Sequence, residues 1–538
     1  MDSKKSFSVS HLDCTLRDGG YYNNWDFDRD LVVEYLDAMG SINIDVVELG
    51  FRSMPVKDFR GAYFYTNNDT IKSLNIDTSL NIGVMLNASD LVSDSESSED
   101  RIKYLFNNES RDLIYMVRIA CHFHEVEKII PAAEWLKKEG YVVGINLMQI
   151  AGKDEAEIQR LTKIVSESTV DILYFADSLG SLEPKDVEHL QNVIGKSWNR
   201  ELGIHTHDNM GNAVSNTLKA IDKGIKWVDS TVTGMGRGPG NAQTEYLILE
   251  LAEINGTEIN SSILLKLINN HFSEMQYKYG WGKNPFYYLA GKYNIHPMYV
   301  QKMLDDNRYD QDDILSLIEY LRDFPSSKFD TTLLDQDWDD EDMDITGEYT
   351  PINDFKDKDV LVIAGGPLLK NYRHEIESYI QKKNTIVICL NAQTPIKESL
   401  INFRVSCHPV RIASDRMKYK SFSTPIFMPL GRLNKKLIEN FNNIEIYNFG
   451  MSIKKDCFKF DESKCTVPSR LVISYCLALI TSGKANKILF AGFDGYGAGD
   501  IRNETINKLL QLYQNSNSSL NISSLTPTNY QLEYTSLF

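Results

Sequence analysis

The chain has 538 residues, more than the ~100–200 residues of an ordinary domain, which predicts two to four folding units. Its 42% hydrophobic and 11% aromatic residues exclude a largely disordered protein. The net charge of −17, from 74 acidic against 57 basic residues, argues against nucleic-acid binding. The sequence contains no run of about 18 apolar residues that could span a membrane, and its N-terminus lacks the apolar core of a signal peptide. Seven scattered cysteines without Cys-x-x-Cys spacing predict a cytoplasmic protein.

Residues 1–260 alternate short apolar runs with amphipathic stretches. The stretches at 28–41, 125–140 and 156–168 have helical spacing. The apolar runs predict eight strands, at 9–16, 44–50, 80–86, 113–120, 141–148, 170–177, 202–208 and 227–234. Eight strands with intervening helices are typical of a (β/α)8 TIM barrel, so we expect an α/β fold with a catalytic barrel at 1–260.

A helical extension and a linker are expected after the barrel. Residues 261–324 carry helical patterns and predict an extension packed on the barrel. Residues 325–350 contain nine acidic side chains and one lysine, Lys328. Such a segment cannot bury apolar surface, so we expect a solvated acidic linker.

Residues 351–538 predict a second, smaller domain. A strand near 359–363 runs into a Gly-Gly-Pro turn, and further strands are expected at 384–391 and 485–496 with a helix at 469–484. Repeated strand, glycine turn and helix units are typical of a doubly wound, Rossmann-like α/β sheet.

Potential metal ligands occur at the ends of the first and seventh predicted strands. His205 and His207 are two residues apart on a strand, so both imidazoles lie on one face. Arg17 and Asp18, followed by two glycines that permit a turn, stand where the first strand ends. Barrel enzymes keep their active sites at this end of the strands. Two imidazoles and a carboxylate suit Mn²⁺ or Mg²⁺ and leave positions open for substrate, so the two motifs together, unlike a lone His-x-His, predict a metal site.

Five ordered motifs carry a family resemblance. They are DCTLRDG at 13–19, VELG at 47–50, DSLG at 177–180, HTHDN at 205–209 and GMGRGPGNA at 234–242. Over residues 8–300 the chain resembles the superfamily of metal-dependent pyruvate aldolases and acyl lyases or synthases, the DRE-TIM metallolyases. Within it, the glycine-rich segment and Ser178 after Asp177 make the chain most similar to the 4-hydroxy-2-oxovalerate aldolases.

The resemblance implies a role for each matching residue. Arg17 would donate hydrogen bonds to the enolate oxygen of the substrate, and Glu48 would hold Arg17 in place. Ser178 would bind substrate together with Arg17 and His205. The metal, Mn²⁺ or Mg²⁺, would polarise a 2-oxo acid as a Lewis acid. Its implied ligands are Asp18, His205 and His207, with Asn241 nearby. Asp13 is expected to be structural.

One departure from the aldolase pattern concerns the general base. Those aldolases place a histidine directly after a turn of Arg-Asp-Gly and a small residue, where this chain has Tyr21, followed by Tyr22. An unperturbed tyrosine titrates near ~10 and is a poor base unless a metal or cation lowers its pKa. Two alternatives stay open: Tyr21 acts as an acid toward the aldehyde oxygen, or the base is His122, His124 or metal-bound water.

Other side chains near these motifs are expected to be structural. Cys14, on the inner face of the first strand, is interpreted as a core residue rather than a nucleophile. His296 and Tyr299 in the extension are expected to pack rather than to close over the pocket. The aromatic residues between 277 and 288 should bury the extension against the barrel.

The second domain resembles, over residues 358–538, the Rossmann-like fold of bacterial sialyltransferases and a related family with a glycine-proline first loop. Members of those families bind nucleotide-linked sugars or pterins. A glycine turn lets backbone approach a phosphate or ribose. The candidate nucleotide contacts are Gly365, Gly366, Asn391 and Asp494. For Asn391 and Asp494 the alternative is that they only cap strand ends.

The leading hypothesis is a metal-dependent aldolase that joins or splits a C–C bond between a pyruvate enolate and an aldehyde. The second domain would hold a nucleotide-linked sugar aldehyde, in surface-polysaccharide biosynthesis, and we expect a homo-oligomer. Two alternatives stay open. One is an acyl-CoA-dependent Claisen synthase of the isopropylmalate or homocitrate type, and the other is a nucleotide-sugar-binding or glycosyltransferase protein with an inactive barrel.

Overall fold

The computed structural model forms two compact units, Met1–Asp306 and Asn307–Phe538. It describes residues 9–93, 95–106, 110–305, 311–323, 345–392, 394–433, 435–441, 444–497 and 500–538. Most of the predicted acidic linker, residues 325–344, lies outside these residues. Within them, no helix combines the length and apolar character needed to cross a membrane.

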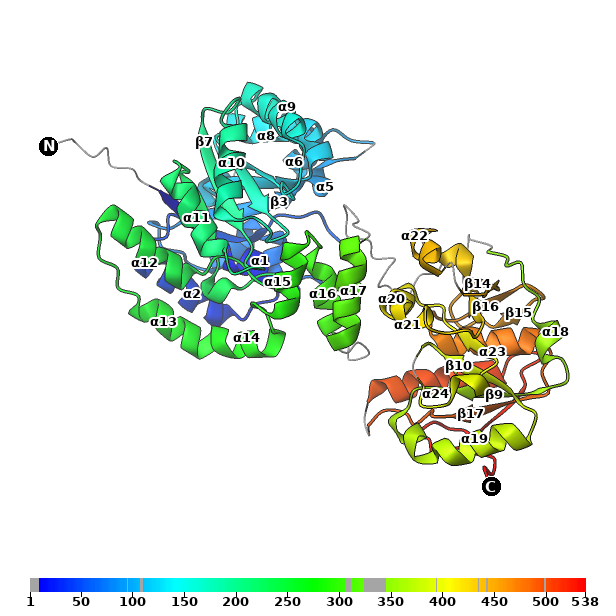
Figure 1. The fold of residues 1–538 in the computed structure, drawn as a ribbon. Helices are drawn as coiled ribbons and strands as arrows, with labels where there is room; N and C mark the ends of the chain where they lie inside the picture. Colours follow the sequence, from blue (N-terminus) through cyan, green and yellow to red (C-terminus); the bar gives the residue numbers. More distant parts are fainter. Residues whose placement is uncertain are drawn as a thin grey trace. The chain divides into compact units, whose positions relative to one another are not determined.

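The first unit is a closed barrel of eight parallel strands in chain order (Figure 1). The strands are β1 (Ser10–Asp13), β2 (Val46–Phe51), β3 (Asn81–Asn87), β4 (Met116–Cys121), β5 (Val142–Leu147), β6 (Ile172–Asp177), β7 (Glu201–Thr206) and β8 (Trp227–Ser230). β8 pairs with β1, which closes the sheet, and Asp13 lies opposite Ser230. The predicted barrel is confirmed, with a strand in each of the eight apolar runs.

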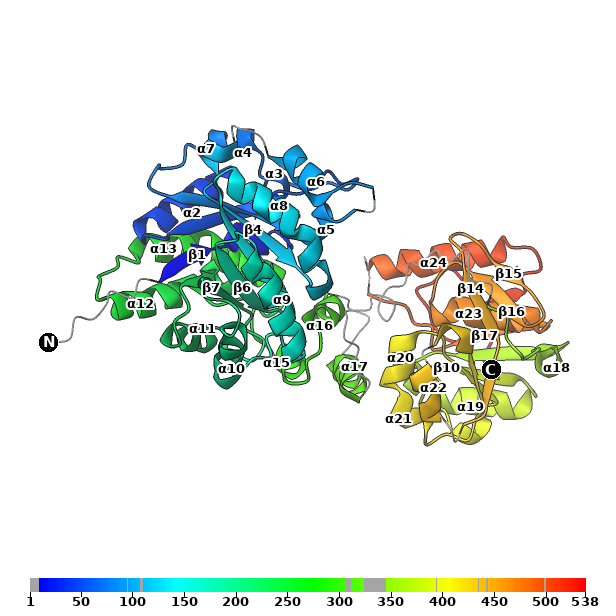
Figure 2. The ribbon, with the colours of Figure 1, turned by 90° about the horizontal axis from the view of Figure 1, so that it is seen from above.

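Helices pack around these strands (Figure 2). The longer ones are α2 (Arg29–Ser41), α6 (Ser98–Leu105), α8 (Val126–Lys138), α9 (Glu155–Glu167), α10 (Pro184–Ile194), α11 (Ala213–Asp222) and α12 (Thr244–Asn255). Short helices fill the early loops: α3 (Ala62–Tyr65), α4 (Asn68–Ser73), α5 (Ala88–Leu91) and α7 (Ser110–Leu113). α2 begins after Asp28, whose carboxylate accepts hydrogen bonds from two backbone N–H groups of the first turn. The apolar faces of these helices cover the strands and form the main core.

The first strand is shorter than the sequence predicts. It ends at Asp13, and the chain turns into the short helix α1 (Thr15–Gly19). Asp13 Oδ1 accepts hydrogen bonds from the backbone N–H and the hydroxyl of Thr15, at 2.9 and 2.6 Å, which ends the strand. Gly19 and Gly20 allow close packing here, since a Cβ would lie 2.5 Å from the Met235 sulfur and 2.0 Å from the Trp25 ring, respectively.

The extension of the first unit contains α13 (Ser262–Leu267), α14 (Ser273–Tyr279), α15 (Pro285–Lys292) and α16 (Pro297–Leu304). The next helix, α17 (Gln311–Asp323), belongs to the second unit, where it packs on α20 (Pro409–Ser414). Asp313 pairs with Arg411 there at 2.6 Å. The sequence grouped α17 with the barrel extension, because a helical pattern does not indicate which surface covers its apolar face.

The second unit contains an eight-stranded parallel sheet, which confirms a second α/β domain. Its strand order is β13 (Ile446–Asn448), β12 (Ile426–Met428), β11 (Phe403–Val405), β10 (Ile386–Leu390), β9 (Asp359–Ile363), β17 (Lys487–Ala491), β18 (Asn521–Ser524) and β19 (Glu533–Tyr534). α19 (Arg373–Lys382) covers one face, and α23 (Val472–Ser482) and α24 (Ile501–Gln514) cover the other. β9, the first strand, lies between β10 and β17, so its carboxyl end is a topological switch point.

Candidate active site

The barrel interior carries one layer of polar side chains from alternate strands, where such barrels usually place apolar ones. Glu48 on β2, Arg118 on β4, Tyr174 on β6 and Asp229 on β8 are all buried. Arg118 donates to Glu48 from Nε and Nη2, at 2.7 and 2.9 Å, and to Asp229 from Nη1 at 2.7 Å. Its guanidinium carbon lies 4.6 Å from the centroid of the Tyr174 ring. This ion-paired layer supports the residues at the carboxyl ends of the strands.

Arg17, in α1, lies between two carboxylates. Its Nε donates to Glu48 at 2.8 Å, the pairing that the sequence led us to expect, and its Nη1 pairs with Asp18. Arg17 is only 6% exposed, and its Nη2 is buried without a hydrogen-bond partner among the described residues. A buried donor without a partner destabilises a protein unless a ligand accepts from it. Arg17 can therefore stabilise negative charge on a bound oxygen.

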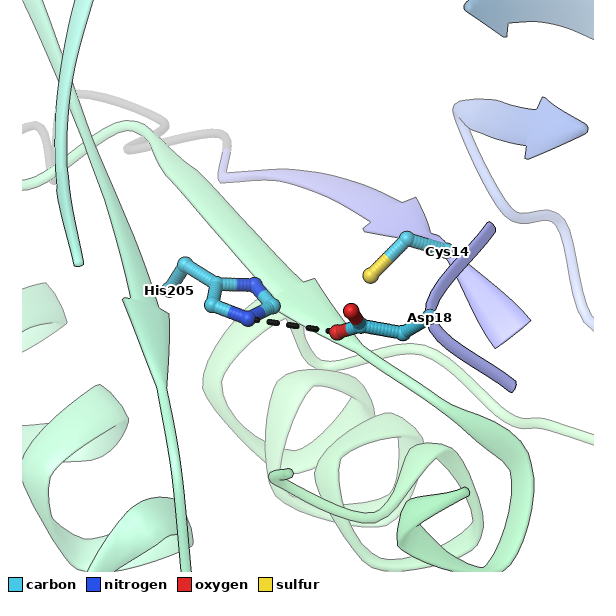
Figure 3. Close-up of side chains that lie close together, drawn as sticks. All are labelled: Cys14, Asp18 and His205. Carbon is cyan, nitrogen blue, oxygen red and sulfur yellow. Dashed lines mark ion pairs between the residues drawn. The ribbon is translucent and has the colours of Figure 1, made fainter. Parts of the chain in front are cut away.

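His205 also lies between two carboxylates. Its Nδ1 is 2.9 Å from Asp229 Oδ2, and its Nε2 is 3.4 Å from Asp18 Oδ2 (Figure 3). Burial by itself lowers the pKa of His205, but Asp18 and Asp229 outweigh it and raise this pKa overall. Burial by itself raises the pKa of Asp18, but Arg17 holds the pKa of that carboxyl far below its usual range. In metal-binding histidines, one ring nitrogen typically hydrogen-bonds to a carboxylate and the other faces the metal and its remaining ligands.

His207 and Asn241 lie beside this pair. The ring centroids of His205 and His207 are 5.2 Å apart. His207 Nδ1 is 3.2 Å from the carbonyl oxygen of Ser178, so Nδ1 carries the proton and Nε2 has a lone pair. Burial lowers the pKa of His207 to about 3, which keeps the ring neutral at ordinary pH. Asn241 donates to Asp18 at 2.6 Å, and its Oδ1 is buried without a partner among the described residues.

These donors fit a divalent cation. Asp18, His205, His207 and Asn241 supply one carboxylate, two imidazoles and an amide oxygen that has no other partner among the described residues. The site and the buried layer below it together hold three carboxylates, those of Asp18, Glu48 and Asp229. These outnumber the two guanidinium groups of Arg17 and Arg118. With neutral imidazoles the cluster has a net charge of −1, which a bound cation balances.

Cys14 is an alternative to His207 as the third metal ligand. In the described part of the chain, Cys14, Asp18 and His205 form a group whose potential ligand atoms lie within 4.8 Å of one another (Figure 3). Cys14 also belongs to the apolar cluster inside the barrel, and burial raises the pKa of its thiol well above the usual value. A neutral thiol is a poor ligand. Both ligand sets share Asp18 and His205, and we expect His207 rather than Cys14 to complete the site.

Ser178 and the two tyrosines lie around this site. Ser178 is half-buried and its hydroxyl accepts a hydrogen bond from the Gln149 backbone N–H at 3.0 Å. Tyr21 is 37% exposed, and its ring is 4.7 Å from that of Trp25. Tyr22 braces the loop after β8, because its hydroxyl donates to the carbonyl oxygen of Gly236 at 3.1 Å.

His122 and His124 directly follow β4. Their rings are stacked with centroids 5.8 Å apart, His122 is half-buried, and His124 is exposed. They therefore stand at the same end of the barrel as Arg17 and His205, and His122 is the more enclosed of the two alternative bases.

The candidate nucleotide residues of the second unit lie at the switch point. Gly365 and Gly366 follow β9, Asn391 follows β10 and Asp494 follows β17. Asp494 Oδ2 accepts a hydrogen bond from the Leu368 backbone N–H at 2.6 Å, and its Oδ1 is buried without a partner in the described residues. A Cβ on Gly366 would lie 2.5 Å from the Asp494 carboxyl carbon, so glycine is required there. Asp494 thus holds the Gly-Gly-Pro loop in place.

Arg118 and Asp229 are not among the site residues predicted from the sequence. Each is a single charged residue within a short apolar strand, MVRIAC in β4 and WVDS in β8. That pattern is the signal that could have identified them, since a charge in a buried strand requires a partner.

Comparisons with known proteins concern mainly the barrel. A family model described as HMGL-like matches residues 8–270. A solved structure, the N-terminal domain of a "putative aldolase" from Bacteroides vulgatus, is 34% identical and covers 56% of this chain and 98% of that one, with a TM-score of 0.51.

Two curated relatives carry different activities in their names. A 4-hydroxy-2-oxovalerate aldolase from Carboxydothermus hydrogenoformans is 34% identical over 142 residues, or 26% of this chain and 41% of that protein. A "putative (R)-citramalate synthase" from Archaeoglobus fulgidus is 26% identical over 257 residues, or 46% of this chain and 50% of that protein. The chain therefore spans half or less of the length of these two relatives.

Proposed function

Because residues 8–270 match the model of the HMGL-like family, whose enzymes are metal-dependent lyases and synthases of C–C bonds, we propose that the barrel is an aldolase. Its substrates would be pyruvate or a similar 2-oxo acid and an aldehyde. The observation that carries this proposal is Nη2 of Arg17, which is buried beside Asp18 and His205 and has no hydrogen-bond partner among the residues that the structure describes. Similarity to a 4-hydroxy-2-oxovalerate aldolase supports the same chemistry.

The chain's own residues bind and stabilise the enolate. When bound by Asp18, His205 and His207, with Asn241 beside them, Mn²⁺ or Mg²⁺ would supply a Lewis acid for the keto oxygen and carboxylate of the 2-oxo acid. Arg17 donates from Nη2 to the oxygen on which enolate charge develops. Because ion pairs already hold its guanidinium in place, this hydrogen bond can lower the barrier by about 3 kcal/mol.

Two further groups act on the substrates in this proposal. Ser178, at the rim of the site, contacts the 2-oxo acid. The proton on the aldehyde oxygen is exchanged with Tyr21 or with His122, which stand at the barrel mouth. Glu48 contributes by positioning Arg17. The Tyr21→Phe and His122→Gln variants distinguish the two proton donors, because only loss of the true donor lowers kcat of aldol addition while leaving pyruvate exchange intact.

The proposal is tested by exchange of the methyl protons of pyruvate in D₂O with Mn²⁺, followed by NMR. We expect the wild-type chain to exchange them only with metal, and the Asp18→Ala and His205→Ala variants to be inactive. Normal exchange in either variant, or without metal, would rule out the metal-dependent aldolase. The Asp45→Asn variant is a control, since Asp45 precedes β2 at the opposite end of the barrel.

A Claisen synthase is the second candidate, and the similarity to a "putative (R)-citramalate synthase" favours it. Such an enzyme uses an acyl-CoA in place of the pyruvate enolate. Incubation with acetyl-CoA and a 2-oxo acid, with detection of the released thiol, distinguishes the two. Thiol release without proton exchange on pyruvate would replace the aldolase by the synthase.

For the second unit we infer a nucleotide or nucleotide-linked sugar site at the carboxyl ends of β9, β10 and β17. Its residues would be Gly365, Gly366, Asn391 and Asp494. Asp494 Oδ1, which has no partner within the described ranges, supports a hydrogen bond to a ribose or base. Calorimetry of the full chain against UDP-, CMP- and GDP-linked sugars tests this. We expect binding to one of them that Asp494→Asn weakens, and absence of binding across the panel would refute it.

A further inference from the structure

The loop after β8 is held rigidly on both sides of Arg237. The backbone N–H of Gly238 donates to the Tyr22 hydroxyl at 3.0 Å, and its carbonyl oxygen accepts from the Gly282 N–H at 3.0 Å. Gly238 has φ +59°, and a Cβ there would lie 3.0 Å from the Tyr287 ring. The extension therefore clamps this loop, so the Arg237 side chain leaves the backbone from a defined point.

The guanidinium of Arg237 lies over an aromatic platform. Its central carbon is 4.3 Å from the centroid of the Tyr21 ring. That ring is itself fixed by Trp25 and Phe51, at centroid distances of 4.7 and 6.3 Å. Arg237 is half-buried, and in the described ranges no carboxylate forms an ion pair with it. A guanidinium held over an aromatic ring still has N–H groups to donate, and these can bind a phosphate or carboxylate through two hydrogen bonds.

The position of Arg237 indicates where its charge acts. Gly236, the preceding residue, lies beside the candidate metal residue Asn241, since a Cβ on Gly236 would lie 2.7 Å from the Asn241 amide nitrogen. On the other side is His296, at the start of α16, whose pKa is lowered to about 4 by burial, Arg237 and His122 together. A substrate that reaches the metal site past α16 comes within range of the Arg237 charge.

We propose that Arg237 binds an anionic group, a phosphate or a carboxylate, on the aldehyde substrate and so selects charged aldehydes over neutral ones. This inference rests on the proposed aldolase function. The 2-oxo acid already has Arg17 and the metal ligands for its charge, which leaves Arg237 to the second substrate. Tyr21 has a positioning role, because its ring holds the guanidinium in place.

The test compares aldehydes in pairs that differ by one anionic group, using the full chain with Mn²⁺ and saturating pyruvate. One pair is glyceraldehyde 3-phosphate and glyceraldehyde, and the other is succinic semialdehyde and butanal, so the two pairs separate phosphate from carboxylate. We expect the wild type to prefer the charged member of at least one pair in kcat/KM. Arg237→Gln should lose about 10–100-fold of that preference, the usual loss for a charge-assisted hydrogen-bond pair. Arg237→Lys should be intermediate, because lysine keeps the charge but not the fork.

Controls separate this proposal from the proposed function. Lys283→Gln removes another cation of the extension. Lys283 already pairs with Asp208 at 3.3 Å, so this variant should leave the preference for charged aldehydes unchanged. Pyruvate exchange in D₂O should be the same in Arg237→Gln and wild type. Equal losses for charged and neutral aldehydes, or a raised KM for pyruvate with unchanged preference, would overturn the role of Arg237. Absence of exchange in the wild type would instead refute the aldolase and, with it, this inference.

Discussion

Replacement of Asp229 by asparagine tests whether the buried layer positions His205. Asp229 Oδ2 accepts hydrogen bonds from Arg118 at 2.7 Å and from His205 at 2.9 Å, whereas its Oδ1 has no partner among the described residues. Asparagine keeps the shape and one acceptor oxygen but removes the charge. Its amide nitrogen would take the place of Oδ1 and remain without an acceptor there.

The structure allows the size of the effect to be estimated. Breaking a buried ion pair costs about 3–5 kcal/mol of folding free energy, and the loss should be smaller here because Arg118 keeps two hydrogen bonds to Glu48. Loss of the carboxylate behind a metal-binding histidine weakens metal binding about 10–100-fold. This corresponds to about 1.4–2.7 kcal/mol of binding free energy.

The assay is calorimetric titration of the full chain with Mn²⁺, at a temperature where circular dichroism shows each variant to be folded. Asp45→Asn is the matched control. It removes a carboxylate that accepts a hydrogen bond from the His11 backbone N–H at 2.7 Å but does not contact His205. We expect the Asp45 variant to bind Mn²⁺ like wild type. If the folded Asp229→Asn variant also did so, Asp229 would not position His205, and our account of the layer would be wrong.

Three other outcomes are expected. Arg17→Lys should lower the rate of pyruvate exchange nearly as much as Arg17→Ala, about 100-fold or more, because lysine cannot reach Glu48 and an enolate oxygen together; near-normal exchange would contradict this role. His207→Ala should weaken Mn²⁺ binding at least about tenfold and Cys14→Ala very little, both by calorimetry, whereas the reverse result would make Cys14 the third ligand. Mn²⁺ affinity should rise with pH, because Asp18 and Asp229 raise the pKa of His205 and the metal competes with the proton on this ring; an affinity that stays constant as the pH rises through the titration of histidine would refute this.

Short-range patterns in the sequence were sufficient to predict the barrel. Apolar runs such as VVELGF at 46–51 form strands because every residue is buried, between the barrel interior and the surrounding helices. The candidate metal residues could also be identified, since His205 is in β7, His207 follows two positions later, and Arg17 and Asp18 come just after β1. These features depend on residues a few positions apart.

The polar layer could not be predicted in the same way. Arg118 is unusual in its strand, but its partners Glu48 and Asp229 are 70 and 111 residues away in the sequence. Nothing local indicates that these three side chains meet. They meet because closure of the sheet brings β2, β4 and β8 around one interior.

The sequence by itself determined the order of strands and helices, the barrel followed by a second parallel sheet, and the residue types at the barrel mouth, since these follow from periodicity and short motifs. Only the tertiary structure decided that Arg118 pairs with both Glu48 and Asp229, that the guanidinium of Arg237 lies over the Tyr21 ring, and that α17 packs with the second unit. Each of these depends on which distant segments come into contact. The burial and charge that such contacts create are properties of the folded chain and not of any local stretch of it.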